Sequence, residues 1–435
     1  HDGNFCMDGL VYPDRTVHTG LLEYKNVYRP ARVISYNKES GELVLHNYMD
    51  FDDLKDYVKI SYELTQDGLV ISKGILPEFS VAPHGEGKTN LKINVPENGK
   101  CYLKLIYHLK KELPLLDEDH ILGFDEIEVS KEDTKCKLAE KWIPKTVVDS
   151  ELQVNENDTQ IHIKGREFAY TIDKRTALFT EMKFAGREYL NHPMELNIWR
   201  APTDNDMYIK AEWKKAHYDK AYTRAYTTEV VQGKHGVKIV SHASVVAETV
   251  QKILDVKITW TIDASGKINA DIEATKDGEF PDLPRFGVRM FLDKKLSDAR
   301  YFGMGPQESY RDKHQAASHG LYRANVRDLH EDYIRPQENG SHYDCGYVEL
   351  NNSRYGMAAF SESTFSFNAS YYTQEELEKK THNYELAESD SVVLCVDYAL
   401  NGIGSNSCGP VVLDQYRFND VLFRFQFTLV PYVKG

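Results

Sequence analysis

The sequence predicts a mainly β protein built from sandwiches, and three observations support this. Apolar and polar residues alternate with a period of two in many short segments, as in strands with one buried face. Turn residues such as Gly, Asp and Pro separate these segments. Helical patterns are few. Many short strands joined by turns are typical of β-sandwiches.

The clearest element is a hairpin. Residues 256–262 alternate strictly, the turn Asp263-Ala264-Ser265-Gly266 follows, and residues 268–274 alternate again. The same alternation predicts further strands at 103–109, 161–163, 168–172 and 423–429. Two helices are expected. One starts at the capping box Thr373-Gln-Glu-Glu376, and the other covers 211–221.

A domain boundary is expected at 130–150, where residues 130–135 are charged and aperiodic. The block 28–130 has about the length of one immunoglobulin-like sandwich. The block 151–435 is too long for such a sandwich and requires a larger two-sheet architecture. Residues 131–150 then form a linker.

Composition excludes several function classes. The chain has 435 residues, 41% of them apolar, and a net charge of -14. A surface this acidic repels phosphate backbones, so nucleic acid is not expected as a partner. No apolar run is long enough to span a membrane, so no membrane association is expected. The six cysteines form no Cys-x-x-Cys pair, which favours reduced thiols in a cytoplasmic protein. The 28 tyrosines suit sugar binding, but strands are also commonly rich in aromatic residues.

Three stretches do not resemble strands. Asn197-Ile-Trp-Arg-Ala-Pro-Thr-Asp-Asn-Asp206 concentrates polar groups that could contact hydroxyls or a cation. Alternatively, it is a turn in which Arg200 pairs with a carboxylate internally. In residues 301–313, Glu308 with Arg311 and His314 forms either an acid-base cluster or a buried salt-bridged corner.

The third stretch, residues 402–410, has three glycines that bracket small polar residues. It either lines a ligand rim or is an ordinary surface connection. No His-Glu-x-x-His or Gly-x-Ser-x-Gly motif is present, and spacing alone nominates no pair of carboxylates for glycoside cleavage. The residues alone therefore indicate no self-sufficient catalytic constellation.

Taken together, these stretches resemble the C-terminal part of the β-galactosidases of glycoside hydrolase family 2. The resemblance spans essentially the whole chain and rests on ordered motifs. These are Phe5-Cys-Met-Asp8-Gly-Leu-Val-Tyr-Pro-Asp14-Arg15-Thr, Trp199-Arg-Ala-Pro-Thr-Asp-Asn-Asp206, Phe302-Gly-Met-Gly-Pro-Gln-Glu-Ser-Tyr310, Pro336-Gln-Glu-Asn-Gly340 and Gly402-Ile-Gly.

The resemblance implies a layout. Residues 1–27 would be the tail of a TIM-barrel catalytic domain, 28–130 an immunoglobulin-like domain, and 151–435 a large β-supersandwich similar to galactose mutarotases. It also implies that both catalytic glutamates and the Mg²⁺ ligands belong to chain that precedes His1. This expectation agrees with the apolar trio Phe5-Cys6-Met7 close to the start.

The resemblance further implies roles for single residues. The backbone carbonyl of Phe5 would bind Na⁺, and the Asp8 carboxylate would contact that ion or the galactosyl 6-hydroxyl. Asp204 and Asn205 would approach the substrate. Relatives carry a stacking Trp in the loop that matches 404–410, whereas this chain has Ser407 and Cys408 there.

The function implied by the resemblance is retaining hydrolysis of terminal β-D-galactosides of the lactose type, in the cytoplasm. This chain would form walls of the substrate pocket and stabilise the assembly. Its partner would be the barrel-containing part of the same enzyme, and the enzyme would be a homo-oligomer. Two alternatives stay open. One is a stand-alone mutarotase-like isomerase that uses a His and a Glu, and the other is a carbohydrate-binding or scaffold module without chemistry.

Overall fold

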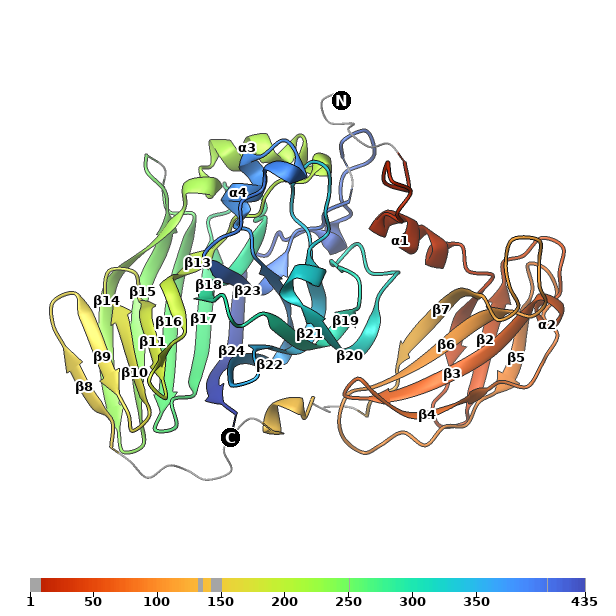
Figure 1. Cartoon of the computed structure of the whole chain (residues 1–435), viewed down its shortest axis with the longest axis horizontal. Coiled ribbons are helices and arrows are strands. Elements are labelled where there is room, and N and C mark those ends of the chain that lie inside the picture. The colour runs from red at the N-terminus through yellow and green to blue at the C-terminus, as the bar shows by residue number, and fades with distance from the viewer. Residues whose placement is uncertain (1–8, 132–135, 142–150, 250, 405, 435) are drawn as a thin grey trace. The chain divides into compact units, whose positions relative to one another are not determined.

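The protein is mainly β, which confirms the predicted fold class (Figure 1). A computed structural model describes residues 9–131, 136–141, 151–249, 251–404 and 406–434. The chain divides into two compact units. The small unit comprises Gly9–Lys137 and His314–Leu321, and the large unit comprises Leu138–Lys313 and the residues from Tyr322 onward. None of the helices in these described ranges has the length and hydropathy needed to cross a membrane.

The small unit is a sandwich of a three-stranded sheet, ordered β1-β2-β5, and a four-stranded sheet, ordered β4-β3-β6-β7. Leu45 from the first sheet and Leu103 and Leu105 from the second are fully buried in one shared core. Seven strands divided in this way are typical of immunoglobulin-like domains. The elements are α1 (Thr19–Val27), β1 (Ala31–Tyr36), β2 (Glu42–Asn47), α2 (Leu54–Tyr57), β3 (Val58–Gln66), β4 (Leu69–Ile75), β5 (Glu86–Asn90), β6 (Cys101–Leu109) and β7 (Ile121–Glu128).

The large unit contains a five-stranded antiparallel sheet and a twelve-stranded one, except for residues 318–321 at the start of β20, which are grouped with the small unit. The first has the order β12-β11-β10-β9-β8 and consists of β8 (Gln153–Glu156), β9 (Gln160–Lys164), β10 (Phe168–Asp173), β11 (Leu178–Phe184) and β12 (Arg187–Glu188). The main path of the second is β13-β18-β23-β22-β24-β17-β16-β15-β14, and β19, β20 and β21 extend it.

The twelve strands of the second sheet are β13 (Leu190–Asn197), β14 (Tyr222–Gly233), β15 (Gly236–Val246), β16 (Leu254–Asp263), β17 (Ile268–Lys276), β18 (Arg285–Asp293), β19 (Asp298–Gly305), β20 (Ser318–Asn325), β21 (Ser341–Asn351), β22 (Tyr355–Ser370), β23 (Ser391–Leu400) and β24 (Leu422–Val433). The α-helices described in the large unit are α3 (Ile209–Lys215) and α4 (Gln374–Lys379). Its short 3-10 helices are η1 (Leu138–Lys141), η2 (Asp204–Asp206), η3 (Tyr218–Lys220), η4 (Val326–Leu329), η5 (Asn383–Glu385) and η6 (Asp414–Tyr416).

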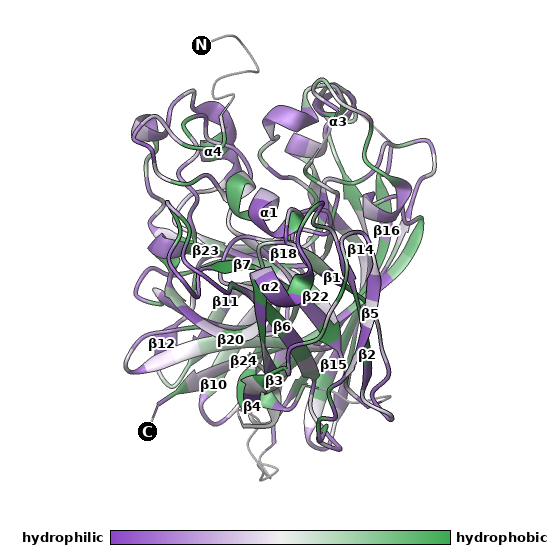
Figure 2. Ribbon diagram, turned by 90° about the vertical axis from the view of Figure 1, so that its right-hand side faces the viewer, coloured by the Kyte–Doolittle hydropathy of each residue, from purple (hydrophilic) through white to green (hydrophobic). Residues whose placement is uncertain are grey.

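The predicted hairpin is confirmed as the antiparallel pair β16–β17. Gly266 adopts a positive φ of 88° in its turn, a conformation that glycine adopts without strain. Trp260 is fully buried at the centre of β16, and its indole N–H donates to the carbonyl of Ala177 at 2.8 Å. Hydrophobic and hydrophilic residues interchange along the strands (Figure 2), as expected for sheets with one face in the core.

The two predicted helices both occur, with different bounds. The hydroxyl of Thr373 accepts a hydrogen bond from the Glu376 N–H at 3.1 Å, so the expected N-cap forms. The Glu376 carboxylate accepts a hydrogen bond from the Ala387 N–H and not from the N-cap backbone, so only one of the two hydrogen bonds of a capping box forms. The helix expected at 211–221 ends at Lys215, because His217 takes a left-handed conformation with φ of 58°.

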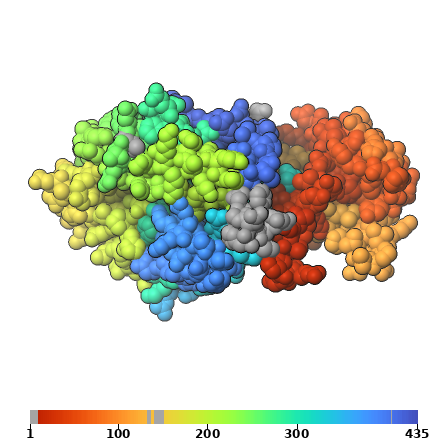
Figure 3. Space-filling model, turned by 90° about the horizontal axis from the view of Figure 1, so that it is seen from above, coloured from red at the N-terminus to blue at the C-terminus, as the bar shows by residue number. Residues whose placement is uncertain are grey.

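Helices α3 and α4 lie at the same end of the strands of the large unit (Figures 1 and 2). They are bridged because Lys214 of α3 pairs with Glu378 of α4 at 2.5 Å, and Glu378 also accepts from the Trp199 indole at 3.2 Å. Seen from this end, the chain around 200–220, around 375 and beyond 400 all reaches the surface (Figure 3).

The predicted linker 131–150 lies largely outside the described residues, apart from Lys131 and the segment that contains η1. Residues 9–27, which the resemblance assigns to a barrel tail, are grouped with the small unit and include α1. The domain boundaries therefore stay predictions.

Candidate functional site

Four loops of the large unit carry the sequence motifs. Loop A, residues 198–208, follows β13, and loop B, residues 401–413, follows β23. Loop C, residues 306–313, follows β19, and loop D, residues 335–340, precedes β21. Ser405 of loop B is outside the described residues. Hydrogen bonds connect all four loops, so motifs far apart in the sequence meet at one place.

Arg200 joins loop A to loop B. Its side chain is fully buried, and its Nη1 and Nη2 donate to the carbonyls of Asn401 and Gly402 at 2.5 and 3.1 Å. The same guanidinium forms a two-bond pair with the Asp206 carboxylate, at 3.2 Å from Nε and 2.7 Å from Nη2. This confirms the prediction that Arg200 pairs internally. A fork of donors held in this way fixes the relative position of both loops.

Asp312 anchors loop B from the other side. Its two carboxylate oxygens accept from the backbone N–H groups of Ile403 and Gly404, at 3.0 and 2.8 Å. A Cβ at residue 402 would lie 2.8 Å from Asp312 Oδ2, so the close approach requires glycine there. Loop B is therefore held in one conformation by loops A and C.

Glu308 forms a buried corner. Its carboxylate accepts from Lys313 Nζ and the Tyr333 hydroxyl, both at 2.5 Å, and from the Gly340 N–H at 2.7 Å. Burial opposes ionisation, but the Lys313 charge and these hydrogen bonds outweigh it and lower the pKa of Glu308. A salt-bridged corner is thus confirmed, with Lys313 rather than Arg311 or His314 as the cation. Arg311 donates to the carbonyl of Arg417, and His314 belongs to the small unit.

Loop D connects to loop A and to a buried charge cluster. The backbone N–H of Glu338 donates to the carbonyl of Ala201 at 3.1 Å. Arg285 pairs with Asp397 at 2.5 Å and with Glu338 at 3.3 Å, and all three side chains are almost completely buried. Burial raises the pKa of both Glu338 and Asp397, while Arg285 acts in the opposite direction.

Loops A and B, with α3, enclose a pocket of about 560 Å³. Its polar groups are carboxylates, amides and one guanidinium, and its apolar groups are aliphatic with one tyrosine. Such a mixture suits a neutral ligand with both hydroxyl groups and C–H surfaces. The lining residues are Asn205, Asp206, Met207, Tyr208, Ile209, Ala211, Glu212, Asp282, Asn401, Gly402, Ile403, Asn406, Val411, Val412 and Arg417.

The structure brings together two of the candidate residues. Asn205 lines the pocket and donates from Nδ2 to the carbonyl of Ile403 at 3.1 Å, while its Oδ1 accepts from the Ser407 hydroxyl at 3.5 Å. Asp204 points elsewhere, because its carboxylate accepts from the Gln337 amide at 3.1 Å. Cys408 is an exposed thiol that does not line this pocket.

Phe5 and Asp8, the candidates for Na⁺, lie outside the described residues. Within the ranges that the structure does describe, no group of three or more His, Cys, Asp or Glu side chains could hold a metal ion. The Na⁺ and Mg²⁺ assignments therefore remain predictions.

Sequence reasoning missed three charged residues of the pocket, Glu212, Asp282 and Arg417. Arg417 pairs with Asp282 at 2.7 Å across 135 sequence positions. Asp282 has one signal in the sequence, because the alternation of apolar and polar residues breaks at Phe280-Pro281-Asp282. Nothing in the local pattern singles out Glu212 or Arg417.

Comparison with known proteins gives two family matches. The model described as "Beta galactosidase small chain" matches residues 164–429, and the model described as "Beta-galactosidase, domain 4" matches residues 43–130. The fold, the site and these matches define the class, a segment of a glycosidase. The chain belongs to the β-galactosidase small-chain family.

Full-length relatives agree with this family. The chain is 44% identical to a β-galactosidase of Actinobacillus pleuropneumoniae and 32% identical to one of Staphylococcus xylosus. In both comparisons 99% of this chain is covered, but only 42% of the relative. The chain thus spans less than half the length of the relatives that it matches.

Solved structures are more distant. The galactose 1-epimerase of Lactobacillus acidophilus NCFM is 9% identical, with a TM-score of 0.34 over 66% of this chain and 99% of that one. A GalM/aldose epimerase homologue of C. elegans is also 9% identical, with a TM-score of 0.31 over 66% and 99%.

Proposed function

We propose that the chain is part of an enzyme that hydrolyses terminal β-D-galactosides of the lactose type with retention of configuration. The family match over residues 164–429 carries the proposal. The arrangement of the four loops supports it, because loops A and B line one polar pocket and loops C and D hydrogen-bond to them. The motifs behind the resemblance therefore meet at one place. The coverage of 42% supports a second, larger part of the enzyme as partner of this chain.

In this proposal, the two carboxylates that act as nucleophile and as acid and base come from that second part. The large unit supplies one wall of the pocket and positions the sugar. Asn205 and Glu212 present an amide and a carboxylate to sugar hydroxyls, and Ile403 contacts C–H groups. Arg200 and Asp312 act through loop B as positioning residues.

A Na⁺ site and a Mg²⁺ site belong to the proposal as well. The Phe5 carbonyl and the Asp8 carboxylate are oxygen ligands of the kind that hard cations prefer. The Mg²⁺ ligands would lie in the partner part. In the complete enzyme, Asp8→Ala should weaken activation by Na⁺ with little loss of stability. Unchanged Na⁺ dependence would remove Asp8 from the site.

Complementation tests the function. The chain is mixed with the part of the Actinobacillus pleuropneumoniae relative that it does not match, and hydrolysis of a chromogenic β-galactoside is measured. We expect activity only on mixing, with neither part active alone. Rapid hydrolysis by the chain alone would contradict the division of roles, and an inactive but stable complex would contradict the function.

The same preparations distinguish the two alternatives. Polarimetry of freshly dissolved galactose detects ring-opening by the chain alone, which would favour a mutarotase-like isomerase. Calorimetry with galactosides detects binding, and binding without rescue of hydrolysis would favour a carbohydrate-binding module.

A further inference from the structure

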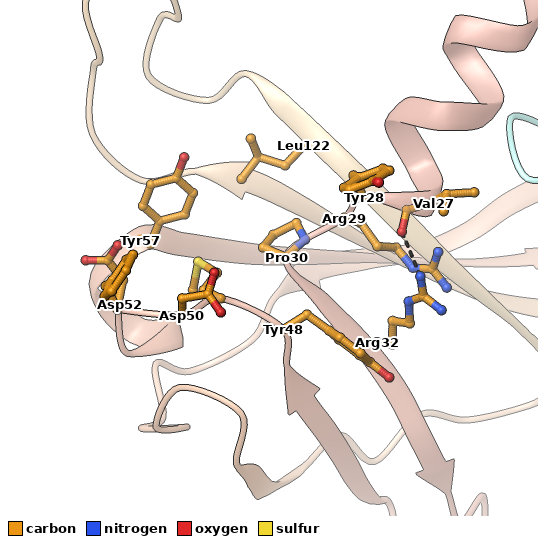
Figure 4. Close-up of a pocket in the computed structure, with 12 residues that line it drawn as sticks. Val27, Tyr28, Arg29, Pro30, Arg32, Tyr48, Asp50, Asp52, Tyr57 and Leu122 are labelled. Carbon is orange, nitrogen blue, oxygen red and sulfur yellow. Dashed lines mark hydrogen bonds between the residues drawn. The ribbon is translucent and has the colours of Figure 1, made fainter.

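The small unit has a pocket of its own, with a volume of about 640 Å³ (Figure 4). It lies where α1 leads into β1, beside the segment between β2 and α2. Tyr57 and Asp52 lie on one side of Pro30 and Tyr28 on the other, Leu122 lies above Pro30, and Asp50 lies between Asp52 and Pro30. The lining residues are Val27, Tyr28, Arg29, Pro30, Arg32, Tyr48, Met49, Asp50, Phe51, Asp52, Tyr57 and Leu122.

Aromatic residues of this pocket are unusually exposed. Phe51 is 92% exposed, Tyr28 68% and Tyr48 47%. A single exposed apolar residue needs no explanation, but several aromatic rings gathered around a concave site mark a binding surface. The core of the small unit does not include these rings, which leaves them available to a ligand.

The segment that carries these rings is rigidly held. Asn47 is fully buried, and its Nδ2 donates to the carbonyls of Asp52 and Val81, each at 2.9 Å. Its Oδ1 accepts from the Met49 N–H at 2.9 Å, and the Tyr48 N–H donates to the carbonyl of Pro30 at 2.9 Å. A segment fixed at both ends loses little entropy when it binds a ligand.

The Tyr48 ring is also held in place. The Arg32 guanidinium carbon lies 4.9 Å from the ring centre, and Arg32 Nη2 donates to the carbonyl of Val27 at 2.7 Å. The other arginine, Arg29, is occupied by Asp125 through two hydrogen bonds at 3.0 and 2.7 Å. Arg29 and Arg32 therefore both interact with neighbouring residues of the small unit.

The charges select a neutral ligand. Asp50 pairs with His84 at 2.8 Å, whereas the Asp52 carboxylate makes no hydrogen bond or ion pair with any residue that the structure describes. These carboxylates disfavour anions, and the nearby Arg32 disfavours cations. Carboxylates and tyrosine hydroxyls accept hydrogen bonds from sugar hydroxyls, and aromatic faces pack on C–H groups.

We propose that this pocket is a second carbohydrate site, which binds a neutral oligosaccharide through Phe51, Tyr48 and Asp52. The proposal concerns binding by the small unit and does not depend on hydrolysis. The proposed binding site is therefore not contradicted if complementation fails. Complementation can also succeed if this pocket binds no sugar.

Calorimetric titration of the chain with lactose, cellotetraose and maltotetraose tests the proposal. We expect saturable binding of cellotetraose or maltotetraose, because lactose is also expected to bind the pocket of the large unit. Phe51→Ala and Tyr48→Ala should each weaken it about tenfold, since each removes a stacking ring. Asp52→Asn should weaken it about threefold, because the amide is a poorer acceptor than the carboxylate. Circular dichroism checks that every variant is folded.

Tyr384→Ala is the matched control, because Tyr384 is an 80% exposed aromatic residue of the large unit. Its affinity for the oligosaccharide should equal that of the unchanged chain. The proposal is overturned if neither cellotetraose nor maltotetraose binds saturably, or if Phe51→Ala binds them with unchanged affinity. Sedimentation that shows Phe51-dependent self-association without sugar binding would also overturn it, and would identify the surface as a contact between copies.

Discussion

Replacing Arg200 with Met should destabilise the large unit strongly. The change removes the cation of a buried ion pair whose side chains are 0% and 5% exposed, and leaves the Asp206 carboxylate without compensation. Breaking such a pair costs about 3–5 kcal/mol. The carbonyls of Asn401 and Gly402 also lose their donor, at about 1 kcal/mol each. Relaxation of the surrounding loops offsets part of this cost, so we expect a total loss of about 4–6 kcal/mol.

Urea unfolding followed by tryptophan fluorescence measures this loss. Trp199, Trp213 and Trp260 are buried in the large unit, and the small unit contains no tryptophan, so the signal reports the large unit. Arg200→Lys keeps the charge without the fork of donors and should lose less. The double variant Arg200→Met/Asp206→Leu should recover part of the loss. A loss below about 1 kcal/mol for Arg200→Met would refute the reasoning.

Two further predictions concern the large unit. Burial lowers the pKa of His342 from 6.5 to about 4, so the unfolded state binds a proton that the folded state excludes between these values. Unfolding free energy should fall as pH decreases from 6.5 to 4, by about 1.4 kcal/mol per pH unit from this group. His342→Gln should reduce this slope in urea titrations, and the exposed control His242→Gln should keep it. Gly402→Ala should cost about 1–3 kcal/mol in thermal unfolding, because its Cβ would meet Asp312 at 2.8 Å. Gly409→Ala, where a Cβ meets nothing within 4 Å, should cost little, and equal losses would contradict this account.

Strand alternation was enough to predict the fold class. The period of two at 256–274 fixes which residues face the core, and the β16–β17 register follows from the turn between them. Helix bounds were less predictable. The pattern at 211–221 contains no glycine or proline, and the helix ends at Lys215 because His217 adopts a left-handed conformation.

Some features of the site could also be predicted from the sequence, and others could not. Local composition identified loops A, B and C as irregular, and Arg200 was correctly expected to pair internally. The partners of long-range pairs were not predictable, because nothing near Glu308 in sequence distinguishes Lys313 from Arg311. The pairing of Arg417 with Asp282 depends on tertiary contact alone.

The central claim is that the pocket between loops A and B serves the galactoside site. The most direct measurement is kcat/KM of the complemented enzyme for a chromogenic β-galactoside with Asn205→Ala in this chain. The account predicts a decrease of about tenfold or more, the cost of leaving a polar sugar group unpaired, while the complex still assembles. An unchanged kcat/KM in an intact complex would contradict it.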